Sequence, residues 1–265
     1  MNIQKQKQLQ KYIYDPIKEA NKQCHLLDFY HILPQLRKDI REHLEHFSYT
    51  QEHIIYLILA IIDMCHFRVG NTKYTKSTGI ATLKKEHIEC NANYSNISFH
   101  GKRQVINQCE ILSKKMNKIL MNLAEYKSDD DFLFTYRDEY NNEHRITAEK
   151  INELLHRYGD ITTKMFRTWK ANYYFIKSIK QLELPSTKGA MKKNISKAVE
   201  STARKLHHTK AICRRSYIDS RIVKLYQESP EKFIKLLKGV KNTNQYLLDD
   251  ENDVLQLLQF ECSNS

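Results

Sequence analysis

Helix-breaking residues are scarce in this sequence. Only 6 glycines and 4 prolines occur among 265 residues, which leaves little room for flexible linkers or for the many tight turns of a β-sandwich. A chain of this length forms one large domain, or one domain with a short appendage. The composition therefore favours a mainly helical fold.

Long apolar runs are also absent. The first residues, MNIQKQKQLQ, contain no apolar signal core. The best apolar run, Ile54 to Cys65, is too short to span a bilayer and contains Asp63. We therefore expect an intracellular protein that does not use a membrane.

Cysteine pairs with metal-binding spacing are missing too. No two of the six cysteines form a CxxC pair, so we expect no zinc site. In an intracellular protein these thiols are expected to stay reduced. The cysteines are Cys24, Cys65, Cys90, Cys109, Cys213 and Cys262.

Basic residues disappear only at the C-terminal end. Lys and Arg number 43 against 31 acids, for a formal net charge of +12, yet none follows Lys241. A body this basic favours a polyanionic partner such as DNA or RNA. Simple solubility, or an AT-rich genome that enriches Lys, Asn, Ile and Tyr, would give the same bias. Five acids follow Lys241: Asp249, Asp250, Glu251, Asp253 and Glu261.

The hydrophobic pattern predicts helices around one small sheet. From Thr50 to Phe67 the chain is apolar nearly all round, which is typical of a helix at the centre of a helical domain. Residues 79–108 alternate short β-branched runs with polar turns, which predicts an antiparallel sheet with a hairpin turn at Gly101-Lys102. The remaining predicted helices cover residues 109–126, 147–158, 162–181, 189–206, 211–227, 230–239 and 244–260.

Five segments carry residues suited to chemistry. They are HFRVGNTKY, GIATLKKEHI, HGK, TTKMFRTWKAN and LHHTKAICRRSYIDSRIV. Taken singly, each has an ordinary interpretation: Tyr217 is one of 16 tyrosines, Lys102 is a turn lysine and Arg68 caps a buried helix. Arg167 and Lys164 are three residues apart, so they share a helix face, which would suit an ordinary solvated surface equally well.

In this order and spacing, the five segments resemble the catalytic domain of type IB DNA topoisomerases, the compact poxvirus, giant-virus and bacterial kind. The resemblance runs from about Tyr12 to the C-terminal helices. It implies the DNA breaking-rejoining fold, mainly helical with a small antiparallel sheet, in residues 47–265. Residues 1–46, helical in pattern with breaks at Pro16 and Pro34, are then expected to be a linker to an N-terminal β domain that is not present.

The resemblance also implies the site residues. The catalytic set is Arg68, Lys102, Arg167, His208 and Tyr217. Contacts to DNA phosphates are implied for Lys73, Tyr74, Lys164 and Asn172. Family members usually have Gly before the histidine and often Pro after the threonine, whereas this chain has His207 and Lys210 there. Both histidines are therefore candidates, and the threonine that follows favours His208.

These residue types suit phosphodiester transesterification. Arginine forks and a histidine can bind the nonbridging oxygens as negative charge develops on them. A tyrosine hydroxyl, with a pKa of about 10 in water, needs a cationic pocket to ionise. A lysine can protonate the leaving 5′ oxygen, and the phosphotyrosine conserves the bond energy, so that resealing needs no ATP. We expect a monomer that relaxes duplex DNA without metal or other cofactor.

Two other functions share parts of this pattern. A tyrosine recombinase or integrase has the same fold and chemistry, but its second arginine usually lies in a His-x-x-Arg motif, where this chain has Lys164-Met-Phe-Arg167. A DNA-binding protein without catalysis would not need all five catalytic residue types. For a viral source, the expected location is a cytoplasmic replication site or the virion.

Overall fold

The computed structural model describes residues 16–70, 78–237 and 244–263, and most of these residues are helical. The helices are α2 (Pro16–Glu45), α3 (Gln51–Cys65), α4 (Lys114–Ala124), α5 (Ala148–His156), α6 (Thr163–Lys180), α7 (Lys188–Lys205), α8 (Lys210–Ser216), α9 (Ser220–Glu228), α10 (Pro230–Leu236) and α11 (Glu251–Ser263). None of those in the described ranges is long and apolar enough to cross a membrane.

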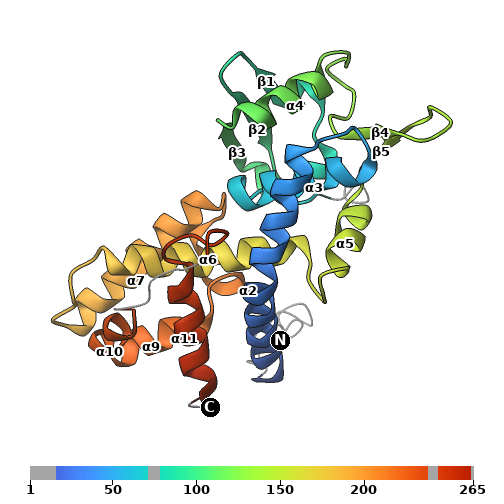
Figure 1. Ribbon diagram of the computed structural model, residues 1–265. Helices are drawn as coiled ribbons and strands as arrows, with labels where there is room; N and C mark the ends of the chain where they lie inside the picture. The colour runs from blue at the N-terminus through green and yellow to red at the C-terminus, as the bar shows by residue number, and fades with distance from the viewer. Residues whose placement is uncertain (1–15, 71–77, 238–243, 264–265) are drawn as a thin grey trace, which may run out of the picture.

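The strands of the described ranges form one small sheet and one hairpin. Antiparallel strands β1 (Ile88–Cys90), β2 (Ser95–His100) and β3 (Ile106–Ile111) lie side by side in that order, and β4 (Thr135–Arg137) pairs with β5 (Glu143–Arg145). The predicted fold class, mainly helical with a small antiparallel sheet, is confirmed, as is the β2–β3 hairpin around Gly101. Figure 1 shows the strands and α4 on one side of the molecule and α6 to α11 on the other, with α3 between them.

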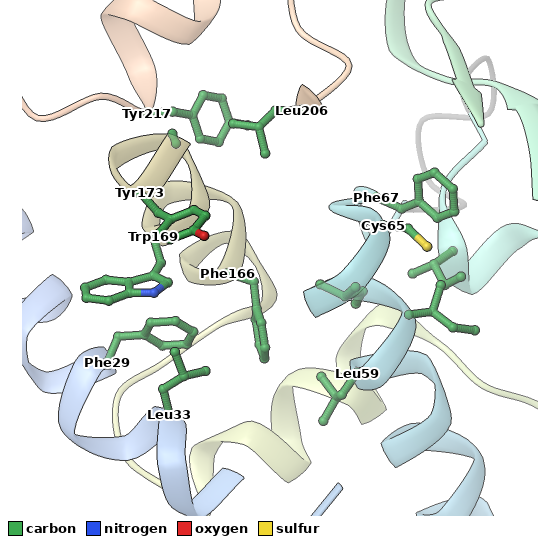
Figure 2. Packing of buried hydrophobic residues seen from close by; sticks show 14 of the residues in the cluster. Phe29, Leu33, Leu59, Cys65, Phe67, Phe166, Trp169, Tyr173, Leu206 and Tyr217 are labelled. Carbon is green, nitrogen blue, oxygen red and sulfur yellow. The ribbon is translucent and has the colours of Figure 1, made fainter. Parts of the chain in front are cut away.

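The centre of the helical part is an aromatic cluster between α2 and α6. The ring of Phe29 lies 5.1 Å from that of Phe166 and 6.3 Å from that of Trp169, and all three side chains are fully buried (Figure 2). Helix α2 runs unbroken through Pro34, so the predicted break there is wrong. Burial of Leu33 on that segment offsets the backbone hydrogen bond that a proline removes.

A partly buried ion cluster holds the acidic C-terminal helix against the helical core. The guanidinium of Arg37 donates to Asp63 and to Glu251, and Glu251 also accepts hydrogen bonds from Trp169 and Lys170. Burial raises the pKa of Asp63, but Lys170 and Arg37 outweigh it and hold the pKa below its usual range. Glu251, at the start of α11, is therefore part of the core. Its pairing with cations offsets the free-energy cost of burying its charge.

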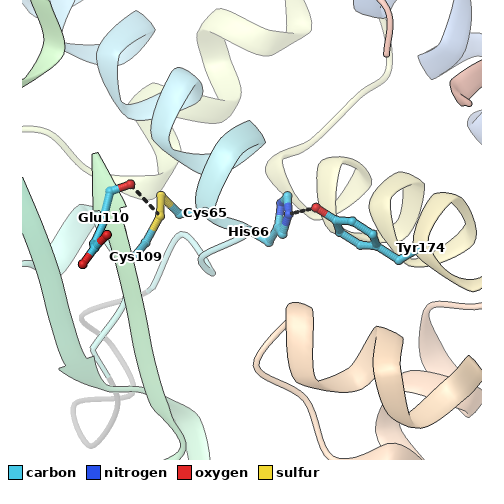
Figure 3. Close-up of a disulfide and its surroundings, with 5 residues drawn as sticks. All are labelled: Cys65, His66, Cys109, Glu110 and Tyr174. Carbon is cyan, nitrogen blue, oxygen red and sulfur yellow. Dashed lines mark hydrogen bonds between the residues drawn. A yellow bond between two sulfur atoms is a disulfide. The ribbon is translucent and has the colours of Figure 1, made fainter. Parts of the chain in front are cut away.

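Two cysteines are joined in a disulfide. Cys65 at the end of α3 is bonded to Cys109 in β3, with a Cα–Cα separation of 5.7 Å (Figure 3). The expectation of reduced thiols is therefore wrong for this pair. The two residues are 44 positions apart, and only the packing of β3 beside the end of α3 brings them together. Cys90 and Cys213 are free.

Candidate active site

A cavity of about 290 Å³ lies where five separate segments meet. The end of α3, the β2–β3 hairpin, the start of α6, the loop between α7 and α8, and the end of α8 each contribute to its wall. Four of the five predicted catalytic residues line it. Lining side chains include Arg68, Lys102, Lys164, His208, Arg215 and Tyr217.

Tyr217 lies at a break between two helices. Residues 211–227 were predicted as one helix, but α8 ends at Ser216 and α9 begins only at Ser220. The break has a local cause, because the carboxylate of Asp219 accepts a hydrogen bond from the backbone N–H of Arg221 and caps α9. Tyr217 therefore projects from a helix end, and its side chain is 5% exposed.

Two arginines surround the Tyr217 ring. Arg68 Nη1 donates to the Tyr217 hydroxyl at 3.0 Å, and the Arg167 guanidinium lies 5.7 Å from the centre of the ring. The hydroxyl and the ring of Tyr217 therefore both lie beside guanidinium groups.

Arg167 is held from behind by backbone carbonyls. Its Nη1 donates to the carbonyl of His66, and its Nη2 donates to that of Leu206 at 2.9 Å and contacts His208 Nε2. The side chain is almost fully buried, and burial is the main cause that lowers its pKa to about 10. It stays charged at neutral pH. Its Nε is buried and has no hydrogen-bond partner among the described residues.

The two neighbouring histidines have different surroundings. The His208 ring lies 4.1 Å from the ring of Tyr217 and contacts Arg167, whereas His207 turns toward Phe67, with ring centres 5.9 Å apart. Burial, Arg167 and Arg68 lower the pKa of His208 to about 2, so its imidazole is neutral at neutral pH. Because Arg167 donates to Nε2, the proton lies on Nδ1. This geometry supports His208 as the catalytic histidine.

Lys102 stands at the tip of the β2–β3 hairpin. The Gly101 N–H donates to the Val105 carbonyl at 2.9 Å and closes the turn. A Cβ on Gly101 would lie 2.4 Å from Asn107 Nδ2, so glycine suits this close approach. Lys102 is exposed and lines the cavity together with Arg68 and Tyr217.

The expected phosphate contacts have different outcomes. Lys164 is exposed and lines the cavity, as a phosphate contact requires. Asn172 is fully buried: its amide donates to the Tyr217 carbonyl at 3.2 Å and accepts from the Asp219 N–H at 2.8 Å. Asn172 therefore braces the backbone around Tyr217 and does not reach the cavity surface in this structure, so a phosphate contact at this residue stays a prediction. Lys73 and Tyr74 lie outside the described residues.

His66 is a contributor that sequence reasoning missed. It ends α3 in the left-handed conformation, with φ of 60°, and this aims its carbonyl at Arg167. Its ring bonds to the hydroxyl of Tyr174 at 2.9 Å, and burial and Lys170 lower its pKa to about 3. Its only sequence signal is its place directly before FRVG.

A substitution of Asn172 can separate an effect on protein stability from an effect on the rate of DNA cleavage. We expect Asn172→Ala to slow single-turnover DNA cleavage at least about tenfold, because a small displacement of the nucleophile is costly. The control is Asn117→Ala, since Asn117 is equally buried and bonds to Ser95 and Asn91 in the sheet region. Both changes are expected to cost about 1–3 kcal/mol of stability. Equal cleavage rates per folded molecule would contradict this role.

Comparison with known proteins identifies the family. The model of the family "Eukaryotic DNA topoisomerase I, catalytic core" matches residues 5–244. The chain belongs to this family. The DNA topoisomerase 1B of Acanthamoeba polyphaga mimivirus is 32% identical over 228 residues, which are 82% of this chain and 68% of that protein. The DNA topoisomerase 1B of vaccinia virus (strain Copenhagen) is 26% identical over 210 residues, 75% of this chain and 62% of that protein.

These matches bear on the predictions from sequence. The resemblance to compact viral type IB topoisomerases, drawn from five short segments, is confirmed. None of these matches supports the recombinase alternative. The chain spans about two thirds of the length of the topoisomerases from mimivirus and vaccinia virus. Roles for individual residues rest on the geometry of the cavity.

Proposed function

We propose that this chain relaxes supercoiled duplex DNA by cutting one strand with Tyr217 and then resealing it, as a type IB DNA topoisomerase. One observation carries the assignment of the site: the Tyr217 hydroxyl accepts a hydrogen bond from Arg68 in a cavity also lined by Lys102 and His208, with Arg167 against the tyrosine ring. Family membership supplies the reaction class, and this cluster supplies the roles.

Cleavage follows from the positions of these groups. The Tyr217 oxygen attacks the phosphorus, the bond from phosphorus to the 5′ oxygen breaks, and a 3′-phosphotyrosyl linkage forms. The leaving 5′ oxygen takes a proton from Lys102. Arg68, Arg167 and the neutral imidazole of His208 bind the nonbridging oxygens, with His208 donating one hydrogen bond. Because these donors are held before DNA arrives, little reorganisation accompanies the reaction.

Resealing is the same sequence in reverse. The 5′ hydroxyl attacks the phosphotyrosine, Tyr217 leaves, and Lys102 takes back the proton. Between the two steps the cut strand rotates about its partner and releases superhelical tension. The linkage stores the energy of the phosphodiester, so neither ATP nor a cofactor is required in this scheme.

The setting of the reaction is part of the proposal. The partner is double-stranded DNA, and the chain acts as a monomer. Residues 47–265 are the catalytic domain, and residues 1–46 join it to a further domain, although α2 also contributes Phe29 to the core. In a virus-infected cell the enzyme works where viral DNA is replicated, or in the virion.

Plasmid relaxation tests the proposed function. We expect the protein to relax negatively and positively supercoiled plasmid in EDTA and without ATP, on plasmids of unrelated sequence. Binding to DNA without relaxation would favour the noncatalytic alternative. Strand exchange confined to plasmids with a particular site would favour a recombinase.

Lys102 has a chemical signature of its own. Lys102→Ala is expected to slow cleavage of ordinary DNA about 100-fold, the size of a general-acid contribution. A substrate with sulfur in place of the bridging 5′ oxygen is expected to restore the rate, because a thiolate leaves without a proton. The control is Lys164→Ala, which removes a cavity-lining charge and should gain nothing from sulfur. No rescue of Lys102→Ala would remove Lys102 from the acid role.

A further inference from the structure

The Cys65–Cys109 disulfide joins the two parts of the molecule that meet at the cavity. Cys65 is the last residue of α3, and Cys109 lies in β3, at one edge of the three-stranded sheet. The two residues differ in exposure, because Cys65 is buried and Cys109 is half-buried. A reagent from solution therefore meets Cys109 first.

On the α3 side, the disulfide is close in sequence to the groups around the nucleophile. His66, the next residue, offers its carbonyl to Arg167 Nη1. Three residues after Cys65, Arg68 donates to the Tyr217 hydroxyl at 3.0 Å. These hydrogen bonds hold the end of α3 beside the nucleophile without the disulfide.

On the β3 side, the disulfide anchors the hairpin that carries Lys102. Cys109 pairs with Ile97 in the β2–β3 ladder, and the last pair before the turn is His100 with Ile106. Lys102 lies in the turn between His100 and Ile106. Contacts of His207 span the same junction, because the Cys65 and Ile106 backbones both hydrogen-bond to its ring. The disulfide therefore helps to fix the position of the Lys102 hairpin relative to Arg68 and Tyr217.

We propose that Cys65 and Cys109 are a site of reversible thiol–disulfide exchange, and that the oxidised form cleaves DNA faster. The reductant is a dithiol, and the oxidant is a low-molecular-weight disulfide. One thiolate of the dithiol attacks Cys109 Sγ, the protein disulfide breaks, and Cys65 leaves as a thiolate that takes a proton. The second thiol of the reductant then attacks the mixed disulfide at the reductant's own sulfur. This releases Cys109 as a thiol and converts the dithiol into a disulfide. Two electrons and two protons pass to the protein, and oxidation reverses the step.

The consequence for catalysis rests on the proposed function. Without the cross-link the hairpin loses its covalent tie to α3, so Lys102 is held less closely near the leaving oxygen. Misplacement of a catalytic group by about 1 Å can cost up to about 100-fold in rate. A partial loosening is expected to slow cleavage about tenfold on reduction. Substrates that need no proton on the leaving group should not show this difference.

The experiment uses the full chain in two redox states. Protein is exposed to dithiothreitol or to glutathione disulfide, the thiols are alkylated, and mass spectrometry of peptides reports the state of Cys65 and Cys109. Single-turnover cleavage is then measured on ordinary DNA and on DNA with the bridging 5′ sulfur. We expect a Cys65–Cys109 cross-link after oxidation, about tenfold slower cleavage of ordinary DNA after reduction, recovery on reoxidation, and equal rates on the sulfur substrate.

Two variants make the result specific. Cys65→Ser with Cys109→Ser is expected to cleave at the rate of the reduced protein in both states. Cys90→Ser, which removes a free thiol in the same sheet, should keep the full redox response. Failure of glutathione disulfide to form the cross-link, or equal cleavage of ordinary DNA in both states, would overturn the proposal. So would a rate difference that persists on the sulfur substrate. Failure of the proposed function would show differently, as no covalent DNA adduct in either state.

Discussion

Tyr217→Phe is expected to abolish covalent DNA cleavage and to leave DNA affinity nearly unchanged. The substitution removes one oxygen, which is the nucleophile, and leaves the cavity lining in place. Phosphate binding comes from the surrounding cations, which supply most of the affinity of proteins for DNA. Denaturing gels of trapped adducts measure cleavage, and fluorescence anisotropy with labelled duplex measures affinity.

A second tyrosine provides the matched control for that loss. Tyr226 is also buried, and its hydroxyl accepts a hydrogen bond from Asn194 at 3.1 Å, outside the cavity. Tyr226→Phe therefore removes a comparable buried hydroxyl and is expected to keep cleavage. An adduct that persists in Tyr217→Phe, or that disappears only in Tyr226→Phe, would place the nucleophile elsewhere.

Arg167→Lys is expected to slow cleavage by about 100-fold to 1,000-fold, the effect of removing one well-placed oxyanion donor. The charge remains, but a single ammonium group cannot reach the carbonyls of His66 and Leu206 and also face the substrate, as the planar fork does. Rapid-quench single-turnover cleavage at saturating protein separates this loss from weaker binding.

Arg37 allows the same chemical change to be made away from the cavity. Its half-buried fork bridges Asp63 and Glu251, so Arg37→Lys is expected to lower the melting temperature. Cleavage per folded molecule should stay near the wild-type rate. Normal cleavage by Arg167→Lys, or an equal loss in both variants, would show that Arg167 serves the fold and not the reaction.

Much of the site could be inferred from sequence because its residues lie in short local motifs. Arg68, Arg167 and Tyr217 each stand in a segment whose order along the chain identifies the family, and folding brings the three together. The motifs do not decide which of the adjacent His207 and His208 faces Tyr217. Their ring directions depend on the left-handed turn at His207, with φ of 52°, which composition does not reveal.

Other features depend on contacts between distant segments. The family resemblance places Asn172 among the phosphate contacts, yet its buried side chain bonds to the backbone of Tyr217 and Asp219 at the α8–α9 break. Pro34 was expected to end a helix, but burial of the residues around it keeps α2 continuous. The Cys65–Cys109 pair follows from the packing of β3 on α3, which no local pattern encodes.

The central claim, that Tyr217 forms the covalent link to DNA, is tested most directly by identifying the linked residue. Wild-type protein is trapped on nicked or supercoiled DNA with denaturant and digested with protease and nuclease, and the nucleotide-bearing peptide is sequenced by mass spectrometry. We expect Tyr217 to carry a 3′-phosphate, with a free 5′ hydroxyl on the other side of the nick. A nucleotide on another residue, or a link to the 5′ phosphate, would contradict the claim.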